Sequence, residues 1–378
     1  MSAESEALTT RTWAEIHPDA IRANAGVVRK YCPQSGIIAV IKADAYGHGA
    51  LTAAHALADR AEIFAVANLE EAQSLQNGGF HQPQLILSPA LPGERAEMVA
   101  AGYLPTISDA GELAAFAALA KNQPVAVSLK VDTGMGRLGF LPGPAESLLQ
   151  SAHQSPGIEI RHICTHLPSA DSDPAFTEAQ LRRFAEFIEP LRKRLPGTTF
   201  HALNSAGILR FGSFAQDFVR PGLMLYGVSP LPEFAAELQP ACTWKTRICL
   251  LRDLPANHGV SYGRRYVAPR AIRTALLPVG YADGYPRPLS ERGAEVLIHG
   301  RRCPVLGMVT MDLVIVDVTS LPHAAVGDEV VLMGPQGNET ITAQELADKA
   351  GTIPWEILTG IQGRVRRVVK PLTGSANF

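Results

Sequence analysis

Cysteine is scarce in this sequence of 378 residues, and the cysteines form no CxxC pair. An odd number of scattered cysteines argues against a disulfide framework, and the missing CxxC pair argues against a structural zinc site. A reducing compartment is therefore the simplest location for the chain. The five cysteines are Cys32, Cys164, Cys242, Cys249 and Cys303.

Neither sign of charge predominates, since 34 Lys and Arg residues stand against 36 Asp and Glu residues. Without a basic excess, we expect the chain to bind neither nucleic acid nor an anionic membrane surface. No apolar run reaches the length of about 18 residues that a membrane-spanning helix needs, and the N-terminus lacks the basic start and apolar stretch of a secretory signal. These features predict a cytoplasmic protein.

Three motifs that identify common enzyme classes are also missing. The sequence contains no HExxH, no Walker A segment and no GxGxxG between a strand and a helix. A metalloprotease, a P-loop enzyme and a dinucleotide-binding protein therefore lose support, and no metal site is predicted. With 46% hydrophobic residues, the composition is that of a well-packed globule, long enough for two domains or one large barrel with an appendage.

Up to about residue 230, short apolar runs alternate with Ala- and Leu-rich segments of helical spacing. This alternation, over roughly 220 residues, predicts βαβ units that close into a parallel (β/α)8 barrel. Ser108, followed by Glu112, is the expected start of one helix. The expected strands are 36–41, 63–67, 84–87, 124–129 and 158–164, and the expected helices are 51–60, 69–76 and one that follows Pro174 and extends to Leu195.

Beyond Pro240 the pattern changes to strand-like runs separated by Gly, Pro and Asn or Asp turns, with one short helix at 343–350. The fold class is therefore α/β, a parallel (β/α)8 barrel followed by a mainly antiparallel β domain. We expect the barrel over 15–235, and the β-rich domain over 1–14 and 236–378. The expected strands are 245–251, 272–278, 294–298, 313–318 and 329–333.

Active sites of such barrels lie at the carboxyl ends of the strands, and the first candidate there is Lys42. A lysine at the end of a buried strand is desolvated, which lowers its pKa and favours the free amine that forms a Schiff base. A lone lysine at a barrel rim can also simply extend its amine into solvent. The following Tyr46, Gly47 and Gly49 favour a ligand site, because glycines let backbone and ligand approach closely.

Other strand ends carry further candidates. The expected fourth barrel strand continues into the glycine-rich segment 130–139, whose Lys and Arg suggest a loop that binds anions, although such loops are common. His166 follows the next apolar run, and a single histidine there is more often a packing residue than a catalyst. Asn204 and Ser205, followed by Arg220, offer hydrogen bonds to a phosphate.

Taken together, these motifs resemble those of a known family. The chain closely resembles the alanine racemase family, pyridoxal-phosphate enzymes built from a barrel and a β domain, and the resemblance covers almost the whole chain. The matching strings are AVIKADAYGHG (39–49), KVDTGMGRLGF (130–140), HALNSAG (201–207), RPGLMLYG (220–227), GVSYG (259–263), GYADG (280–284) and RCPVLGMVTMD (302–312).

This resemblance implies racemisation of alanine with two bases and pyridoxal 5'-phosphate as cofactor. Lys42 would hold the cofactor as a Schiff base and serve as one base, and Tyr262 would be the second base, supplied by the partner subunit of a homodimer. Two bases are required because a racemase removes a proton from one face of the α-carbon and returns it on the other. His201 would support Tyr262, with Arg220 behind it.

The resemblance also assigns the cofactor's surroundings. Arg220 would face the pyridine nitrogen, and Arg137 the phenolic oxygen and the substrate. Lys130 matches a lysine that is carbamylated in many members, where it holds Arg137. The phosphate would be bound by Tyr46, Ser205, Gly222 and Leu223, with His166 and Asn204 as further cofactor contacts. Met311 of the other subunit would contact the substrate carboxylate through its backbone, and the supporting residues would be Tyr281, Asp312 and Trp355.

Two positions depart from the family pattern. Trp355 stands where the family usually has Tyr, and Met308 stands where many members have an Arg of the substrate entry, although Arg287 matches another entry position. Indole has one N–H donor and no acceptor, so it only partly replaces a phenol. The range of substrates beyond alanine therefore stays open, as does a role in making D-alanine for peptidoglycan or L-alanine for catabolism.

Two other functions share parts of this pattern. Pyridoxal-phosphate decarboxylases of basic amino acids or diaminopimelate have the same architecture but place a catalytic Cys in the β domain. Here Cys303 lies in RCPVLG, and Thr310 precedes Met311. A non-catalytic protein that holds pyridoxal phosphate would be a single barrel. The additional β domain carrying Tyr262 argues against that alternative.

Overall fold

The computed structural model describes residues 10–143 and 157–372. The chain forms two compact units. The barrel unit comprises Ala20–Ala45 and Ala50–Gln239, and the β unit comprises the described residues of Met1–Asp19, Tyr46–Gly49 and Pro240–Phe378. Each unit is described by itself.

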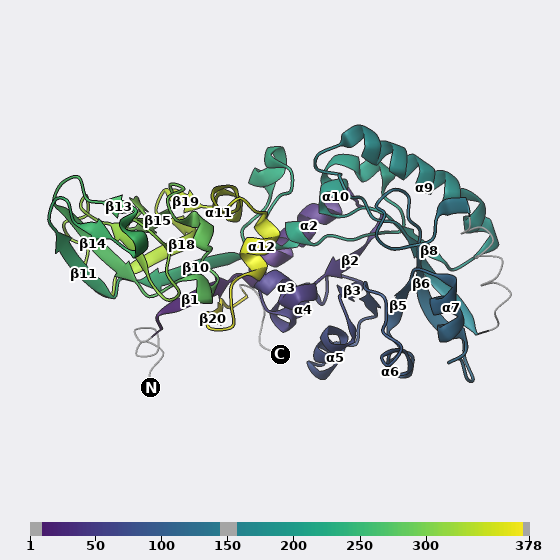
Figure 1. Cartoon of the computed structure of the whole chain (residues 1–378). Coiled ribbons are helices and arrows are strands. Elements are labelled where there is room, and N and C mark those ends of the chain that lie inside the picture. Colours follow the sequence, from purple (N-terminus) through teal and green to yellow (C-terminus); the bar gives the residue numbers. More distant parts are fainter. Residues whose placement is uncertain (1–9, 144–156, 373–378) are drawn as a thin grey trace. The chain divides into compact units, whose positions relative to one another are not determined.

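Eight parallel strands close into the barrel, which confirms the predicted fold class (Figure 1). The last strand pairs with the first, since Gly36 and Ile37 lie in register with Phe218 and Val219. Apolar strand residues such as Phe64 and Leu85 are fully buried. The strands are β2 (Gly36–Val40), β3 (Ile63–Val66), β4 (Gln84–Ile86), β5 (Leu104–Ile107), β6 (Val125–Lys130), β7 (Ile158–Cys164), β8 (Thr199–His201) and β9 (Phe218–Val219).

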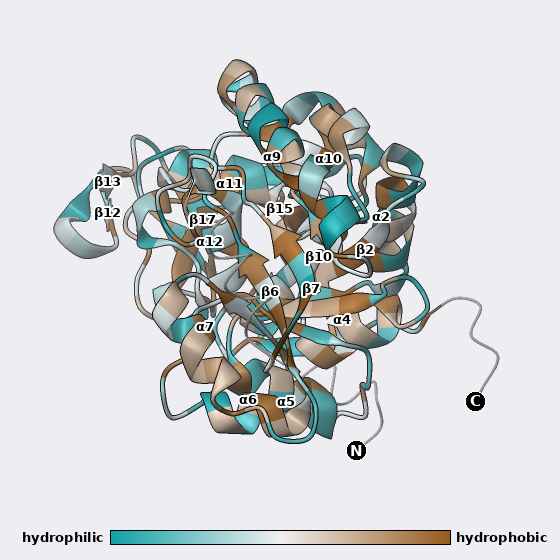
Figure 2. Ribbon diagram, turned by 90° about the vertical axis from the view of Figure 1, so that its right-hand side faces the viewer, coloured by the Kyte–Doolittle hydropathy of each residue, from teal (hydrophilic) through white to brown (hydrophobic). Residues whose placement is uncertain are grey.

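Among the described residues, helices lie between most successive barrel strands, and the longer ones bury an apolar side. In α9 (Pro174–Arg194) the predicted stripe of Leu181, Phe184, Ile188 and Leu191 is buried, and polar residues alternate with it along the ribbon (Figure 2). No helix within 10–143 or 157–372 is long and apolar enough to cross a membrane. The others are α2 (Pro18–Tyr31), α3 (Lys42–Gly47), α4 (Ala50–Leu57), α5 (Leu69–Asn77), α6 (Arg95–Ala101), α7 (Ala110–Ala117) and α10 (Ser205–Phe211).

Two expectations for the barrel were wrong. The N-cap of α7 is Asp109, not Ser108, because the Asp109 carboxylate accepts the N–H of Glu112 at 2.8 Å. Lys130 ends the fifth barrel strand, not the fourth, since β5 was not predicted. That strand has only four residues and contains Pro105, which cannot donate to a ladder and weakens the strand pattern.

The β unit contains one large sheet in the order β16-β15-β18-β10-β1-β20, with β19 on β18, and a three-stranded sheet β11-β14-β17. Its ladders are antiparallel except that β1 pairs with β20 in parallel. The strands are β1 (Thr12–Ile16), β10 (Cys242–Arg247), β11 (Leu250–Leu254), β14 (Ile272–Leu277), β15 (Glu295–Ile298), β16 (Arg301–Pro304), β17 (Val314–Asp317), β18 (Glu329–Gln336), β19 (Glu339–Ile341) and β20 (Arg366–Val369).

Two further expectations needed correction here. The run predicted as one strand over 245–251 is two strands, because at Ile248 and Cys249 the backbone changes partners, from Asp328 to Leu276. The helix α11 (Ala343–Ala350) was predicted, but a second helix follows it, α12 (Pro354–Thr359), with proline at its first position.

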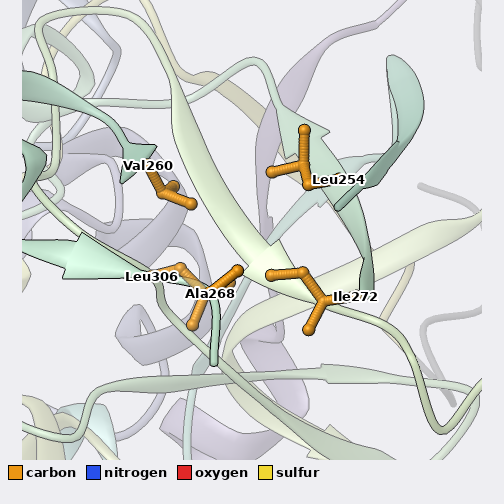
Figure 3. Close-up of a cluster of buried hydrophobic side chains, with 5 residues drawn as sticks. All are labelled: Leu254, Val260, Ala268, Ile272 and Leu306. Carbon is orange, nitrogen blue, oxygen red and sulfur yellow. The ribbon is translucent and has the colours of Figure 1, made fainter. Parts of the chain in front are cut away.

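A small hydrophobic cluster holds the projecting hairpin of β12 (Gly259–Val260) and β13 (Tyr266–Val267) to the three-stranded sheet. Figure 3 shows its five buried side chains converging from the hairpin and the neighbouring strands. They are Leu254, Val260, Ala268, Ile272 and Leu306. The cluster fixes the base of the segment that carries Tyr262.

Candidate functional site

Lys42 lies two residues beyond β2, at the start of α3, and its side chain is half-buried. Burial lowers the pKa of Lys42, the positive charge of Arg137 lowers it further, and the Glu71 carboxylate opposes both. This is the environment that the sequence predicted for a lysine that reacts as a free amine.

The turn after Lys42 is left-handed. Ala43, Asp44, Ala45 and Tyr46 have φ between +51° and +54°, a conformation that costs about 1–2 kcal/mol per residue with a side chain. The Asp44 carboxylate accepts the Ala50 N–H at 2.7 Å and so helps to close the turn. Four consecutive residues in this conformation indicate that their surroundings hold the turn.

A glycine ends this turn for a steric reason. Gly47 has φ +81°, and a Cβ there would approach the backbone oxygen of Leu358 at 2.5 Å. Leu358 belongs to α12, the helix that also carries the half-buried Trp355. Tyr46, the residue before this glycine, is buried, and burial raises the pKa of its phenol to about 12.

Arg220, one residue beyond β9, is buried and connects several strand ends. It donates to the backbone oxygens of Thr165 and Ala202 at 2.6 and 3.0 Å. It also lies 2.5 Å from Nδ1 of His201 and 3.4 Å from Nδ1 of His166. Because a guanidinium only donates, both Nδ1 atoms accept, which places the ring proton of each histidine on Nε2.

Both histidines are neutral at ordinary pH. Burial, followed by the charge of Arg220, lowers the pKa of each ring well below its usual range. His201 is 0% exposed, and its Nε2 has no hydrogen-bond partner among the described residues. A ring enclosed in this way has no surface for a residue of another chain, whereas His166 is only half-buried.

The loop after β9 meets the start of α10 through Ser205. Its Oγ accepts the N–H of Gly222 at 3.0 Å and that of Met224 at 3.3 Å, which leaves the hydroxyl proton to be donated elsewhere. Asn204 is the N-cap of α10, since its Oδ1 accepts the Gly207 N–H at 3.0 Å. Leu223 begins the buried 3₁₀ turn that follows Gly222.

The glycine-rich loop already encloses an anion from the chain itself. The Asp132 carboxylate accepts the backbone N–H groups of Gly134, Met135 and Gly136 at 2.7–2.9 Å. Burial raises the pKa of Asp132, but these three bonds outweigh it and lower the pKa overall. We expected this loop to bind an external anion, but the Asp132 carboxylate already occupies its N–H groups. An Asp just before a glycine-rich turn is the sequence signal for this arrangement. Arg137 beyond it is exposed.

Lys130, the last residue of β6, is buried beside this loop. Burial lowers its pKa to about 8, with the charges of Arg220 and Arg137 acting in the same direction and those of Cys164 and Asp132 opposing them. About a tenth of this amine is therefore uncharged at pH 7, and about half at pH 8.

The remaining predicted residues lie in the β unit and are exposed. Tyr262 is 74% exposed, Met311 52% and Tyr281 40%, and Asp312 is exposed as well. Hydrogen bonds connect them, because the segment 308–311 accepts from Ser261 at one end and from Tyr281 and Ala282 at the other. Exposed aromatic and apolar side chains on segments that hydrogen bonds hold together are typical of an interface.

Arg364 holds the end of this segment. It pairs with Asp312 at 2.9 Å and with the buried Asp283 at 3.1 Å. Of the two entry positions, Arg287 is exposed and Met308 is half-buried. Within the described ranges, no group of His, Cys, Asp or Glu side chains is arranged to hold a metal ion.

A parallel barrel with a desolvated lysine at a strand end, joined to a β unit with exposed aromatic residues, defines a class of two-domain barrel enzymes. The family model for the alanine racemase N-terminal domain matches residues 16–230, and that for the C-terminal domain matches residues 241–369. The chain belongs to the alanine racemase family, which consists of pyridoxal-phosphate-dependent isomerases, and the predicted resemblance is confirmed.

Individual relatives match this chain over almost their whole length. An alanine racemase of Methylacidiphilum infernorum (isolate V4) is 41% identical over 97% of this chain and 95% of that protein. The crystal structure of alanine racemase from Streptomyces lavendulae is 34% identical, with a TM-score of 0.90 over 96% of this chain and 97% of that one. Another, from Bartonella henselae with covalently bound pyridoxal phosphate, is 29% identical, with a TM-score of 0.87 over 96% of this chain and 100% of that one.

The left-handed turn generates a prediction about stability. Ala43 is exposed at positive φ, so Ala43→Gly should raise the free energy of unfolding, by up to about 1 kcal/mol, because glycine carries no Cβ penalty there. Ala114 is an exposed alanine inside the right-handed helix α7, so Ala114→Gly should lower the same quantity by about 1 kcal/mol.

Urea titrations of the two variants and the wild type measure both changes. The same substitution should thus have opposite signs at the two positions. A loss of stability of equal size in both variants would contradict the left-handed turn.

Proposed function

We propose that this protein interconverts L-alanine and D-alanine by proton transfer between two bases, with pyridoxal 5'-phosphate bound in the barrel unit. The observation that carries the proposal is Lys42, a lysine with a lowered pKa at the start of a left-handed turn beyond β2. Family membership supports the reaction, and the strand-end groups around Arg220 support the site.

The described residues fit the cofactor. Lys42 would bind its aldehyde carbon covalently, and Arg220 would face the pyridine nitrogen without giving up a proton. The hydroxyl of Ser205, with two backbone N–H groups already on its oxygen, has its own proton to donate to a phosphate. When bound, the cofactor supplies an electron-withdrawing ring that acidifies the α-hydrogen of the amino acid.

The other predicted contacts with the cofactor and substrate are part of the same proposal. We assign Tyr46 and Leu223 to the phosphate and Arg137 to the phenolic oxygen and the substrate carboxylate. Asn204 holds the Ser205 turn as its N-cap, and so acts on the phosphate through Ser205. Gly222 already donates to Ser205, which gives it the same indirect role.

Proton transfer needs a base on each face of the substrate. Lys42 serves one face, and Tyr262 of the partner subunit serves the other. A phenol is a weak base near neutral pH unless a neighbour stabilises its phenolate. We assign that contact to His166, which is only half-buried, has Nδ1 toward Arg220 and therefore carries a donor on Nε2. The enclosed His201 then acts by holding Arg220.

The partner's β unit supplies the contact to the substrate carboxylate in this proposal. Met311 of the partner subunit would make that contact through its backbone, with Tyr281 and Asp312 as supporting residues. Trp355 would flank the substrate entry, and its position on α12, the helix that packs against Gly47, supports a place near Tyr46. Supply of D-alanine for peptidoglycan, or of L-alanine for catabolism, is the corresponding cellular role, and a cytoplasmic location stays a prediction.

The first test is the reaction itself. Purified protein with pyridoxal 5'-phosphate, given L-alanine, should lose optical activity without releasing carbon dioxide, and Lys42→Ala should reduce the rate on the order of 10³-fold or more. Lys121→Ala, at an exposed lysine of the barrel unit, is the control and should behave as wild type. Carbon dioxide release would indicate a decarboxylase, and bound cofactor without turnover would indicate a homeostasis protein.

The second test concerns the partner subunit. Lys42→Ala and Tyr262→Phe chains are each expected to form impaired homodimers, with Tyr262→Phe losing proton exchange mainly on one face of the α-carbon. When equal amounts are mixed under subunit exchange, half of the dimers are mixed and one of their two sites has both bases, so about a quarter of wild-type activity should return. If mixing restores nothing, each site is built within one chain.

The third test concerns Lys130. We propose that its uncharged amine adds to carbon dioxide with loss of one proton, and that the resulting carbamate holds Arg137. Because the pKa of Lys130 is about 8, the uncharged amine increases as the pH rises through that value. At constant dissolved ¹³C-labelled carbon dioxide, the carbamate signal in the NMR spectrum should therefore increase from about one pH unit below this pKa to about one above.

The variants separate this lysine from the others. Lys130→Met should remove the carbamate signal, while Lys121→Met should leave it. A signal that persists in Lys130→Met belongs to another amine, and that result would exclude carbamylation at this position.

A further inference from the structure

We propose that Glu71 is a positioning residue for Lys42, because its carboxylate ties the left-handed turn after Lys42 to the end of the neighbouring strand β3. This role deepens the proposed function, since it rests on Lys42 being the reactive lysine of the site. Neither the motifs nor the expected site residues included Glu71.

The carboxylate of Glu71 connects two strand ends. Glu71 lies in the first turn of α5, where the N-cap Asn68 accepts its N–H at 3.0 Å. One carboxylate oxygen accepts the N–H of Ala67, just beyond β3, at 2.7 Å. The other accepts the N–H of Ala43, the residue after Lys42, at 2.8 Å. One rigidly capped side chain therefore holds the backbone on which Lys42 begins its turn.

The turn needs this support because its conformation is unfavourable by itself. Ala43 is the first of four residues in the left-handed region, so its N–H marks the point where the chain leaves the direction of β2. A carboxylate that accepts this N–H stabilises the change of direction and also places a negative charge beside the Lys42 amine. Glu71 and Arg137 are the two charges that act on Lys42, in opposite directions.

The barrel contains a matched comparison in Glu112. It occupies the same position in α7, three residues after the N-cap Asp109. Its two carboxylate oxygens accept the N–H of Ser108, beyond β5, at 3.0 Å and that of Ala90, beyond β4, at 3.1 Å. Glu112 is not among the charges that shift the pKa of Lys42. It therefore has the same structural function without a reactive lysine next to it.

The experiment compares Glu71→Gln with Glu112→Gln in the full chain. Each substitution removes one negative charge and one backbone acceptor, so both should lower the midpoint of thermal unfolding by a similar amount. Only Glu71→Gln should lower the pKa of Lys42 in protein freed of cofactor, measured by competitive acylation of lysines across pH and mass spectrometry. The physical reason is that the opposing carboxylate is lost.

Turnover with pyridoxal 5'-phosphate is the second measurement. Glu71→Gln should lower kcat for L-alanine by roughly ten- to a hundredfold with a smaller change in KM, because a displaced reactive group acts mainly on the chemical step. Glu112→Gln should stay within about twofold of wild type. Glu71→Asp keeps the charge but shortens the side chain, so it should keep the pKa of Lys42 close to wild type while kcat stays low.

The outcomes separate this inference from the proposed function. Equal titration of Lys42 in Glu71→Gln and Glu112→Gln, or equal loss of kcat in both, overturns the role of Glu71. A wild-type protein that binds the cofactor but does not racemise alanine overturns the proposed function. The acylation measurement needs no substrate, so in that case it alone decides whether Glu71 acts on Lys42.

Discussion

Burial around one enclosed guanidinium determines the protonation of the two histidines at the barrel's strand ends. Arg220 donates to two backbone oxygens and approaches two imidazoles, and its charge is enclosed in the low dielectric of the barrel interior. Burial, followed by this charge, keeps His166 and His201 neutral, and the same charge contributes to the lowered pKa of Lys130. The two imidazoles are therefore neutral, and the Lys130 amine loses its proton at a lower pH than it would in water.

Carboxylates shape the loops around this charge. Asp132 accepts three consecutive backbone N–H groups, and Asp44 accepts the Ala50 N–H. Glu71 accepts the N–H groups of Ala43 and Ala67, which follow two neighbouring strands. These carboxylates give the loop N–H groups acceptors within the chain, and the Asp132 and Glu71 carboxylates each accept more than one of them. The acidic residues of these loops therefore bind backbone N–H groups, and the proposed ligand contacts fall mainly on basic and hydroxyl side chains.

The β unit holds its functional residues by other interactions than the barrel does. A hydrophobic cluster and a salt-bridged arginine hold two segments whose aromatic and sulfur side chains remain exposed. Exposed Tyr262 and Met311 are unfavourable on an isolated surface. A second copy of the chain that covers them would explain both their exposure and the rigid support beneath them, in agreement with the proposed homodimer.

The sequence by itself determined the alternation of strands and helices in the barrel, the change to a β-rich unit after Pro240, and the lysines and arginine at the strand ends. Those features are local, because they depend on apolar periodicity and on motifs read along the chain. It did not reveal β5, which a proline interrupts, or α12, which begins with a proline, and both elements are very short. It also did not reveal that the backbone changes its hydrogen-bond partner from Asp328 to Leu276 after Ile248. These depend on which neighbours the element packs against.

Only the tertiary structure decided how the site groups interact. The acceptor role of each histidine follows from where Arg220 lies, and the direction of each pKa follows from burial and from charges distant in sequence. Glu71 and Ala43 are 28 residues apart, and the hydrogen bond between them exists because β2 and β3 are adjacent in the barrel. A motif shows which side chains follow one another along the chain. Their burial and their long-range hydrogen bonds arise only when the strands close into the barrel.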